Sequence, residues 1–387
     1  MIELFWLLLP VAALSGWWVA RFGDRGRSRK RASALSADYY RGLNFLLNEE
    51  QDKALEVFMR LVEVDSETIE THLALGGLFR RRGEVDRAIR IHQNLLARPS
   101  LDQLQRSVAL LELAKDYMHA GLLDRAETLF RDLVRQRSQL KESLEHLLEL
   151  YQRENEWQAA IDVARELGAM SGESLKPVIA HCYCEIGLQH KKNNVIDKAI
   201  AALKSATAED PRSVRPNILL GNIFFEDGQY QAAYRHYLRI FEQDEEFIPE
   251  ILDRVIECVE KGIPAPEFES YVRILSKDQK RSMLIPGLAR YIFITQGFEP
   301  AIGYINEQLK RSPTLRSLKE WVVLEKLGQR EQHAQLFIVI EALRKVLQQL
   351  PSYQCRQCGY ASTMLSWQCP GCHHWSSIKP GTRFLSH

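Results

Sequence analysis

The chain has 387 residues, of which 45% are hydrophobic and 26% charged, a composition that suits two or three globular domains or one long repeat array. Its 51 basic and 50 acidic residues leave a net charge of +1, which argues against a general nucleic-acid binder. The seven cysteines are an odd number and four of them form C-x-x-C pairs, which suggests metal or redox sites in a reducing compartment and not a disulfide framework.

The first twenty residues predict a membrane anchor. The segment from Leu4 to Ala20 carries no charge, and 17 helical residues span about 25 Å, the short end of what crosses a bilayer. Basic residues crowd the linker that follows, residues 21–34, whereas a cleaved signal peptide would carry them before the apolar run. The positive-inside rule therefore predicts a single-pass anchor over residues 1–20, with the N-terminus outside and the rest in the cytoplasm. A buried N-terminal helix of a soluble fold is the alternative.

Small residues recur with a period of 34 between residues 35 and 348. The pairs are Gly42 and Gly76, Ala54 and Ala88, Ala126 and Ala160, Gly187 and Gly221, and Ala199 and Ala233. Each tetratricopeptide repeat needs small residues where its two helices, A and B, approach each other, so the period predicts an all-α array of stacked helix pairs. We expect about eight to nine units, of which those after residue 245 are degenerate. Glycine stands at the predicted A–B turns, where a left-handed backbone is needed: Gly83, Gly121, Gly228 and Gly262.

A stack of such helix pairs forms a superhelix whose concave face, lined by the A helices, binds segments of partner proteins. The repeat register places four polar side chains on that face: Arg80, Arg81, Lys115 and Asn222. These residues are candidate partner contacts. For each of them, ordinary solvated surface is the alternative interpretation.

The last residues, 351–387, predict a small metal-binding module. Two C-x-x-C pairs, Cys355 with Cys358 and Cys369 with Cys372, supply four thiolates that can surround one ion tetrahedrally. So short a segment cannot bury enough apolar surface to fold without such support. Zinc and iron both suit a four-thiolate site, and the spacing does not choose between them. Because four cysteines complete the coordination shell, a structural or electron-transfer role is favoured over hydrolysis.

The residues around the cysteines predict how the module is built and docked. Gly359 and His373 follow the two pairs at turn positions where a positive φ is expected, and His373 is a strained choice there. His373 and His374 are expected to be surface or packing residues, since the shell is already complete. Four aromatic residues are too many for the surface of so small a module, so some should pack against the array: Tyr353, Tyr360, Trp367 and Trp375.

Two further features bear on function. The stretch from His181 to Cys184 lies in a predicted A helix, where its C-x-C thiols diverge and buried core cysteine is expected. No G-x-S-x-G, P-loop, H-E-x-x-H or dinucleotide-binding fingerprint occurs in the sequence, so nothing supports an enzyme.

The combination of anchor, array and cysteine pairs resembles the lipopolysaccharide assembly protein B family of Gram-negative bacteria. The resemblance rests on Leu7–Ala13 in the anchor, Gly83–Gln93 in the second repeat, and the four cysteines together with Trp375–Pro380 in the tail. It implies an inner-membrane helix, cytoplasmic tetratricopeptide repeats and a C-terminal rubredoxin-type domain. The four cysteines match the family's metal ligands one for one, and the resemblance implies iron as the usual metal.

The same resemblance implies a regulatory role without enzymatic activity. The family sets lipopolysaccharide levels by promoting degradation of the deacetylase that commits precursor to lipid A, through a membrane-bound ATP-dependent zinc protease. Other lipopolysaccharide synthesis and transport proteins are further implied partners, and a homo-oligomer is left open. The alternative from another class is an iron-sensing, redox-sensing or electron-transfer protein. A zinc-ribbon nucleic-acid binder is disfavoured by the charge and the anchor.

Overall fold

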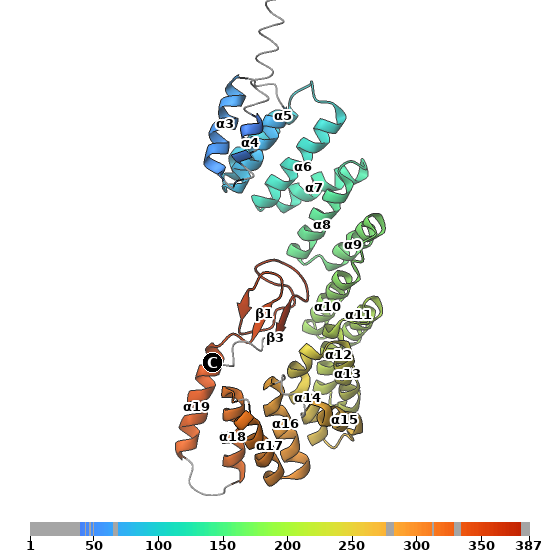
Figure 1. Ribbon diagram of the computed structural model, residues 1–387. Coiled ribbons are helices and arrows are strands. Elements are labelled where there is room, and N and C mark those ends of the chain that lie inside the picture. Colours follow the sequence, from blue (N-terminus) through green and yellow to red (C-terminus); the bar gives the residue numbers. More distant parts are fainter. Residues whose placement is uncertain are drawn as a thin grey trace, which may run out of the picture. The chain divides into compact units, whose positions relative to one another are not determined.

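The computed structural model describes residues 39–380, except for residues 43, 46–47, 49, 65–68, 276–281, 312 and 329–333 (Figure 1). The chain divides into two compact units, Met1–Asn155 and Glu156–His387. The predicted anchor and basic linker lie outside the described residues. None of the described helices is long and apolar enough to cross a membrane.

The first unit is a stack of helices. Its helices are α3 (Gln51–Val64), α4 (Ile69–Arg81), α5 (Val85–Leu96), α6 (Gln103–His119), α7 (Leu123–Arg135) and α8 (Leu140–Glu154). Hairpins pair α4 with α5 and α6 with α7, and the A helices α4, α6 and α8 contact one another in sequence. Gly83 and Gly121 turn the hairpins with φ of 80° and 74°, which confirms the predicted turn glycines. This is the tetratricopeptide architecture, in which A helices line the inner face.

The period of 34 has a direct packing cause in this unit. Ala54 and Ala88 are fully buried. A Cβ added at Gly76 would lie 2.4 Å from Nε2 of His92, and one added at Gly42 would lie 2.8 Å from Cζ of Phe58. A side chain on the B helix therefore fills the space that the missing Cβ leaves on the A helix.

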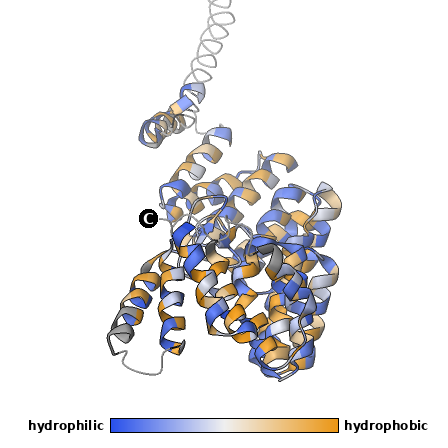
Figure 2. Ribbon diagram, turned by 60° about the horizontal axis from the view of Figure 1, so that its bottom comes forward, coloured by the Kyte–Doolittle hydropathy of each residue, from blue (hydrophilic) through white to orange (hydrophobic). Residues whose placement is uncertain are grey.

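The second unit continues the helical pairs. Its helices are α9 (Trp157–Ser171), α10 (Lys176–Lys192), α11 (Ile196–Glu209), α12 (Val214–Glu226), α13 (Tyr230–Gln243), the 3₁₀ turn η1 (Glu245–Phe247), α14 (Ile248–Glu260), α15 (Pro266–Leu275), the 3₁₀ turn η2 (Ser282–Leu284), α16 (Ile285–Gln296), α17 (Phe298–Arg311), α18 (Leu315–Gly328) and α19 (Ala334–Gln349). The A helices contact each other in the pairs α10 with α12, α14 with α16, and α16 with α18. Hydrophobic and hydrophilic residues are interspersed along these helices, as amphipathic repeats require (Figure 2).

The same small residues bring the helices of this unit together. A Cβ at Gly221 would lie 2.4 Å from Cε1 of Tyr237, and one at Gly187 would lie 2.9 Å from Cγ of Leu203. Gly228 and Gly262 turn their hairpins with φ of 76° and 87°, as predicted.

After residue 245, aromatic packing is added to the small-residue contacts, which continue at Gly287, where a Cβ would lie 2.3 Å from Cδ2 of Leu252. Phe268, on the ten-residue helix α15, is fully buried. Its ring meets that of Tyr291 on α16 edge to face at 4.8 Å, and it lies 5.9 Å from the ring of Phe241 on α13. Large rings thus hold the helices whose repeat signature is weakest.

After α19 the chain forms a three-stranded antiparallel sheet of order β2-β1-β3. Its strands are β1 (Tyr353–Cys355), β2 (Ala361–Ser362) and β3 (Ile378–Pro380). Tyr353 pairs with Ser362 on one side and with Pro380 on the other. The fold is therefore a helical repeat array with a small β module at its C-terminal end.

Candidate metal centre

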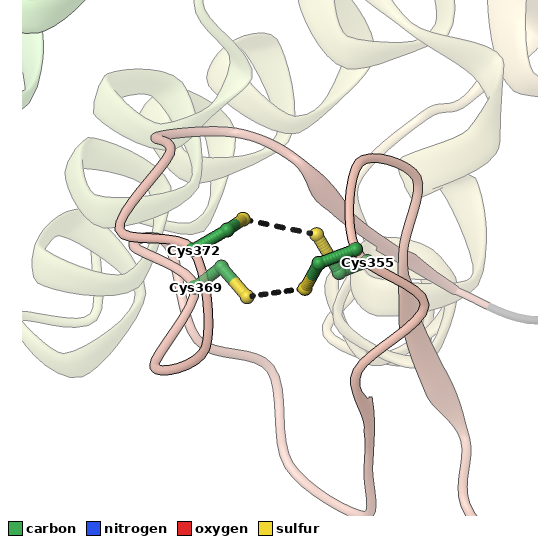
Figure 3. A group of neighbouring side chains, drawn as sticks. Cys355, Cys369 and Cys372 are labelled. Carbon is green, nitrogen blue, oxygen red and sulfur yellow. Dashed lines mark hydrogen bonds between the residues drawn. The ribbon is translucent and has the colours of Figure 1, made fainter. Parts of the chain in front are cut away.

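The four predicted cysteines come together in the C-terminal module. Their sulfurs all lie within 4.8 Å of one another. Cys355 Sγ lies 3.7 Å from Cys372 Sγ, and Cys358 Sγ lies 3.6 Å from Cys369 Sγ, so each contact joins one C-x-x-C pair to the other (Figure 3).

These distances fit a tetrahedral metal site. With metal–sulfur bonds of about 2.3 Å, the sulfurs of a tetrahedron are separated by about 3.8 Å. A disulfide would instead require an S–S distance of about 2.05 Å. The four cysteines can therefore hold one metal ion. The donor set is shared by zinc and iron sites, so it does not identify the metal.

Each C-x-x-C pair is closed by backbone hydrogen bonds. In the first, Gly359 N–H donates to the Cys355 carbonyl at 3.1 Å and Cys355 N–H donates to the Tyr360 carbonyl at 2.8 Å. In the second, His373 N–H donates to the Cys369 carbonyl at 2.8 Å. Gly359 has a φ of 78° and His373 a φ of 56°, as expected from their positions. The left-handed backbone costs a histidine roughly 1–3 kcal/mol that glycine would not lose.

The environment of Cys355 favours its thiolate. Burial alone would raise the pKa of this thiol, but Ser377 Oγ and the backbone N–H groups of Cys358 and Gln357 outweigh burial and lower the pKa to about 6. Cys355 Sγ lies 3.3 Å from Ser377 Oγ. A thiolate is the form that binds a metal, so this environment favours Cys355 as a ligand.

The site is buried on one side and open on the other. Cys355 and Cys369 are buried, Cys372 is half-buried and Cys358 is exposed. His373 and His374 are both exposed, and His374 Nδ1 lies 2.9 Å from the carbonyl oxygen of Cys372. Both histidines are surface residues, as expected.

Two tryptophans attach the module to the helices of the second unit. Trp375 stacks on His181 of α10, with ring centroids 4.6 Å apart and planes 18° apart. Trp367 stacks on Phe247 of η1 at 5.2 Å and 18°. The guanidinium of Arg215, on α12, lies 5.6 Å from the ring of Trp367 and 5.8 Å from that of Trp375. The expectation that some of the aromatic residues pack against the array is confirmed.

Polar contacts surround this aromatic centre. Tyr353 Oη donates to Glu250 Oε1 at 2.9 Å, and burial raises the pKa of both groups. Arg356 forms an ion pair with Glu246 at 2.8 Å. Lys379 forms another with Asp244, which directly precedes η1.

His181 and Arg215 are the functional residues that sequence reasoning missed. Cys182 and Cys184 are fully buried core residues as expected, and burial raises the pKa of each to about 12. His181, next to them, instead lies 2.7 Å from Ser376 Oγ, a residue 195 positions away in sequence. No spacing rule connects such distant residues, and nothing in the local sequence marks either one.

The predicted groove residues of the first unit are engaged with neighbouring helices. Arg80 on α4 forms ion pairs at 2.7 Å with Glu112 and with Asp116 on α6. Lys115 on α6 reaches Glu112 at 2.8 Å and Glu142 on α8 at 2.5 Å. Both cations are therefore neutralised within the unit, and neither is ordinary solvated surface.

The other two predicted groove residues differ from each other. Arg81 is exposed. In the second unit, Asn222 on α12 accepts a hydrogen bond from Tyr237 Oη at 2.8 Å, so it joins α12 to α13.

Matches to family models agree with this architecture. Residues 353–380 match a family model described as a rubredoxin metal binding domain, and residues 71–106 and 185–245 match tetratricopeptide repeat models. Among solved structures, the C-terminal part of a tetratricopeptide repeat-containing protein from Cytophaga hutchinsonii aligns with a TM-score of 0.41 and 13% identity, over 69% of this chain and 98% of that chain.

Relatives that match over nearly the whole chain identify its family. The chain is 38% identical over 383 residues to lipopolysaccharide assembly protein B of Escherichia coli strain K12, covering 98% of each. It is 33% identical over 395 residues to the protein of the same name from Haemophilus influenzae strain Rd, again covering 98% of each. The chain belongs to the lipopolysaccharide assembly protein B family.

Proposed function

We propose that this protein is a membrane-tethered adaptor in lipopolysaccharide assembly, with no catalytic activity of its own. The names of its full-length relatives support the process. The repeat array supports the adaptor role, because stacked helix pairs present extended surfaces to partner proteins.

The observation that carries the adaptor role is the way the metal module is built into the array. Four cysteines can fill the coordination shell of one ion and would leave no position for a substrate. Trp367 and Trp375 then fasten the module to helices of the second unit. A closed metal site that is fixed to a binding scaffold shapes a surface, whereas a catalytic metal keeps an open position.

The adaptor acts on the enzyme that commits precursor to lipid A. It presents that deacetylase to a membrane-bound ATP-dependent zinc protease, and so lowers lipopolysaccharide synthesis. The N-terminal anchor confines the array to the inner membrane surface with its bulk in the cytoplasm. This raises its effective concentration for a membrane-bound protease. Other lipopolysaccharide synthesis and transport proteins gather on the same scaffold.

The test is recovery of both partners from native membranes. Affinity-tagged full-length chain should co-purify with the protease and the deacetylase, and the half-life of the deacetylase should lengthen when the chain is deleted. A variant that lacks residues 1–20 should bind the deacetylase but fail to shorten its half-life. Recovery of neither partner, together with an unchanged deacetylase half-life, would refute this function.

A second candidate function is iron sensing, redox sensing or electron transfer, favoured by one observation. Cys358 is exposed, so one edge of the metal site is close to solvent and within reach of a redox partner. A visible Fe(III)–thiolate absorption band that bleaches reversibly on reduction would support this role. A colourless protein that contains one zinc per chain would count against it.

A further inference from the structure

The loop from His373 to Ser377 contacts both the metal site and helix α10. On its inner side it completes the metal site: Cys369 N–H donates to the His374 carbonyl at 3.0 Å, and Arg356 N–H donates to the Ser377 carbonyl at 2.8 Å. Ser377 Oγ lies 3.3 Å from Cys355 Sγ and 3.0 Å from the His374 carbonyl oxygen. These contacts place the loop against the sulfur of Cys355 and the backbone of Cys369.

On its outer side the same loop docks on α10. Trp375 stacks on His181, and Ser376 Oγ lies 2.7 Å from His181 Nε2. The candidate ligand Cys372 and the docking residue Trp375 are therefore only three residues apart.

The loop is also strained. His373 has a φ of 56° and Ser376 a φ of 53°, the left-handed region that side chains other than glycine rarely adopt. Strained backbone persists only where surrounding contacts impose it. Bonds from a metal to Cys369 and Cys372 would impose it directly, because His373 follows this ligand pair. Four thiols at contact distances of 3.6–3.7 Å hold each other far more weakly than metal–sulfur bonds would.

The receiving surface is built for this loop. His181 is 1% exposed, and burial together with the neighbouring Arg215 lowers its pKa to about 3, so the ring is neutral. Arg215 Nη1 lies 3.4 Å from His181 Nδ1. Because arginine can only donate, Nδ1 is the acceptor and Nε2–H donates to Ser376 Oγ. Arg215 is itself 4% exposed and pairs with Glu185 at 2.6 Å.

This surface lies where a repeat array binds its partners. His181 belongs to α10 and Arg215 to α12, both A helices, and A helices line the inner face of such a stack. The small sheet lies beside these helices in Figure 1. The metal module thus occupies part of the surface that other arrays offer to a partner segment.

We propose that the loop His373–Ser377 makes docking of the module depend on a filled metal site, so that loss of the metal undocks the module and uncovers the inner face of α10 and α12. A bound metal then keeps this surface of the second unit covered by the module. This inference stands whether or not the protease and deacetylase are the partners.

The experiment uses the full-length chain in detergent and histidine modification by diethyl pyrocarbonate, read by mass spectrometry. With metal bound, His181 should be protected and the exposed His374 should react. After the metal is removed with a chelator, modification of His181 should accelerate at least tenfold. Cys258, fully buried in α14, should stay unreactive to alkylation, which shows that the second unit remains folded.

Matched variants separate docking from metal binding. Trp375→Ala leaves all four cysteines in place, so it should retain one metal per chain and yet expose His181 to modification. Tyr360→Ala removes an exposed aromatic residue of the same module and should leave His181 protected. Readdition of metal to the chelated protein should restore protection.

Two results would overturn the proposal. In the first, His181 stays protected after the metal is removed, which would mean that docking does not depend on the metal. In the second, Cys258 becomes reactive as fast as His181, which would mean that the metal stabilises the whole second unit and not only the docking of the module.

Discussion

Arg215 connects the metal module to two helices of the second unit, and its removal tests the docking argument quantitatively. Its guanidinium pairs with Glu185 on α10 and lies over the rings of Trp367 and Trp375. The substitution Arg215→Ala removes these contacts together and leaves the carboxylate of Glu185 without its partner.

The magnitude follows from burial. Removing one partner of a buried ion pair costs about 3–5 kcal/mol, and each cation–π contact adds about 0.5–1 kcal/mol at modest desolvation. The side chain of Arg215 is 5% exposed, but that of Glu185 is 25% exposed and can partly regain water. The sum of about 4–7 kcal/mol is therefore discounted for this hydration, and we expect the docked state to lose about 3 kcal/mol.

Amide exchange measures this loss locally, which is necessary because a chain of two units need not unfold in one step. A loss of about 3 kcal/mol should speed opening-limited exchange in β1 and β3 by about 100-fold. Arg212→Ala is the matched control, because Arg212 is exposed just before α12. If Arg215→Ala exchanges within threefold of Arg212→Ala, the cation is not what holds the module.

Three further predictions concern other parts of the molecule. The pKa of His181 falls from 6.5 to about 3 on folding, so the stability that its neutral ring contributes is complete above pH 6.5 and is lost as pH falls towards 3. The free energy of docking, measured by amide exchange, should therefore weaken by about 2 kcal/mol between pH 7 and pH 5. The substitution His181→Phe should flatten that pH dependence. Gly76→Ala should destabilise the first unit in urea by about 1–3 kcal/mol, because the new Cβ meets His92, whereas Gly77→Ala should be neutral or slightly stabilising. Asp116→Ala should lower the free energy of unfolding by about 3–5 kcal/mol in the same assay, because it removes a fully buried carboxylate that pairs with Arg80 and His92. A loss below about 1 kcal/mol would show that these three residues are not energetically coupled.

Local features of the chain were predictable from the sequence because their causes are local. Gly83 and Gly228 turn hairpins since a left-handed backbone is least costly for glycine. The period of 34 reflects one contact repeated between the two helices of a pair, as at Gly221 and Tyr237. The four cysteines were recognisable because a C-x-x-C pair places both sulfurs through the geometry of a single turn.

A similar turn shows the limit of such reasoning. Asn194 has a φ of 60° between α10 and α11, at the position where other hairpins use glycine. Asparagine tolerates this left-handed conformation, but the presence of an asparagine in the sequence does not by itself predict it. The turn is visible only once the flanking helices are in place.

What the tertiary structure alone decided is which partner each polar side chain meets. By sequence, Arg80 was a candidate contact for another protein, yet Asp116, 36 positions away, neutralises it within the first unit. His181 lies in a stretch expected to be core and is buried, but the structure alone shows that its partner is Ser376, 195 positions away. The sequence shows the chemical type of each side chain. Charge pairing and ring stacking depend on distances across the fold, and those distances are set by how the helices pack.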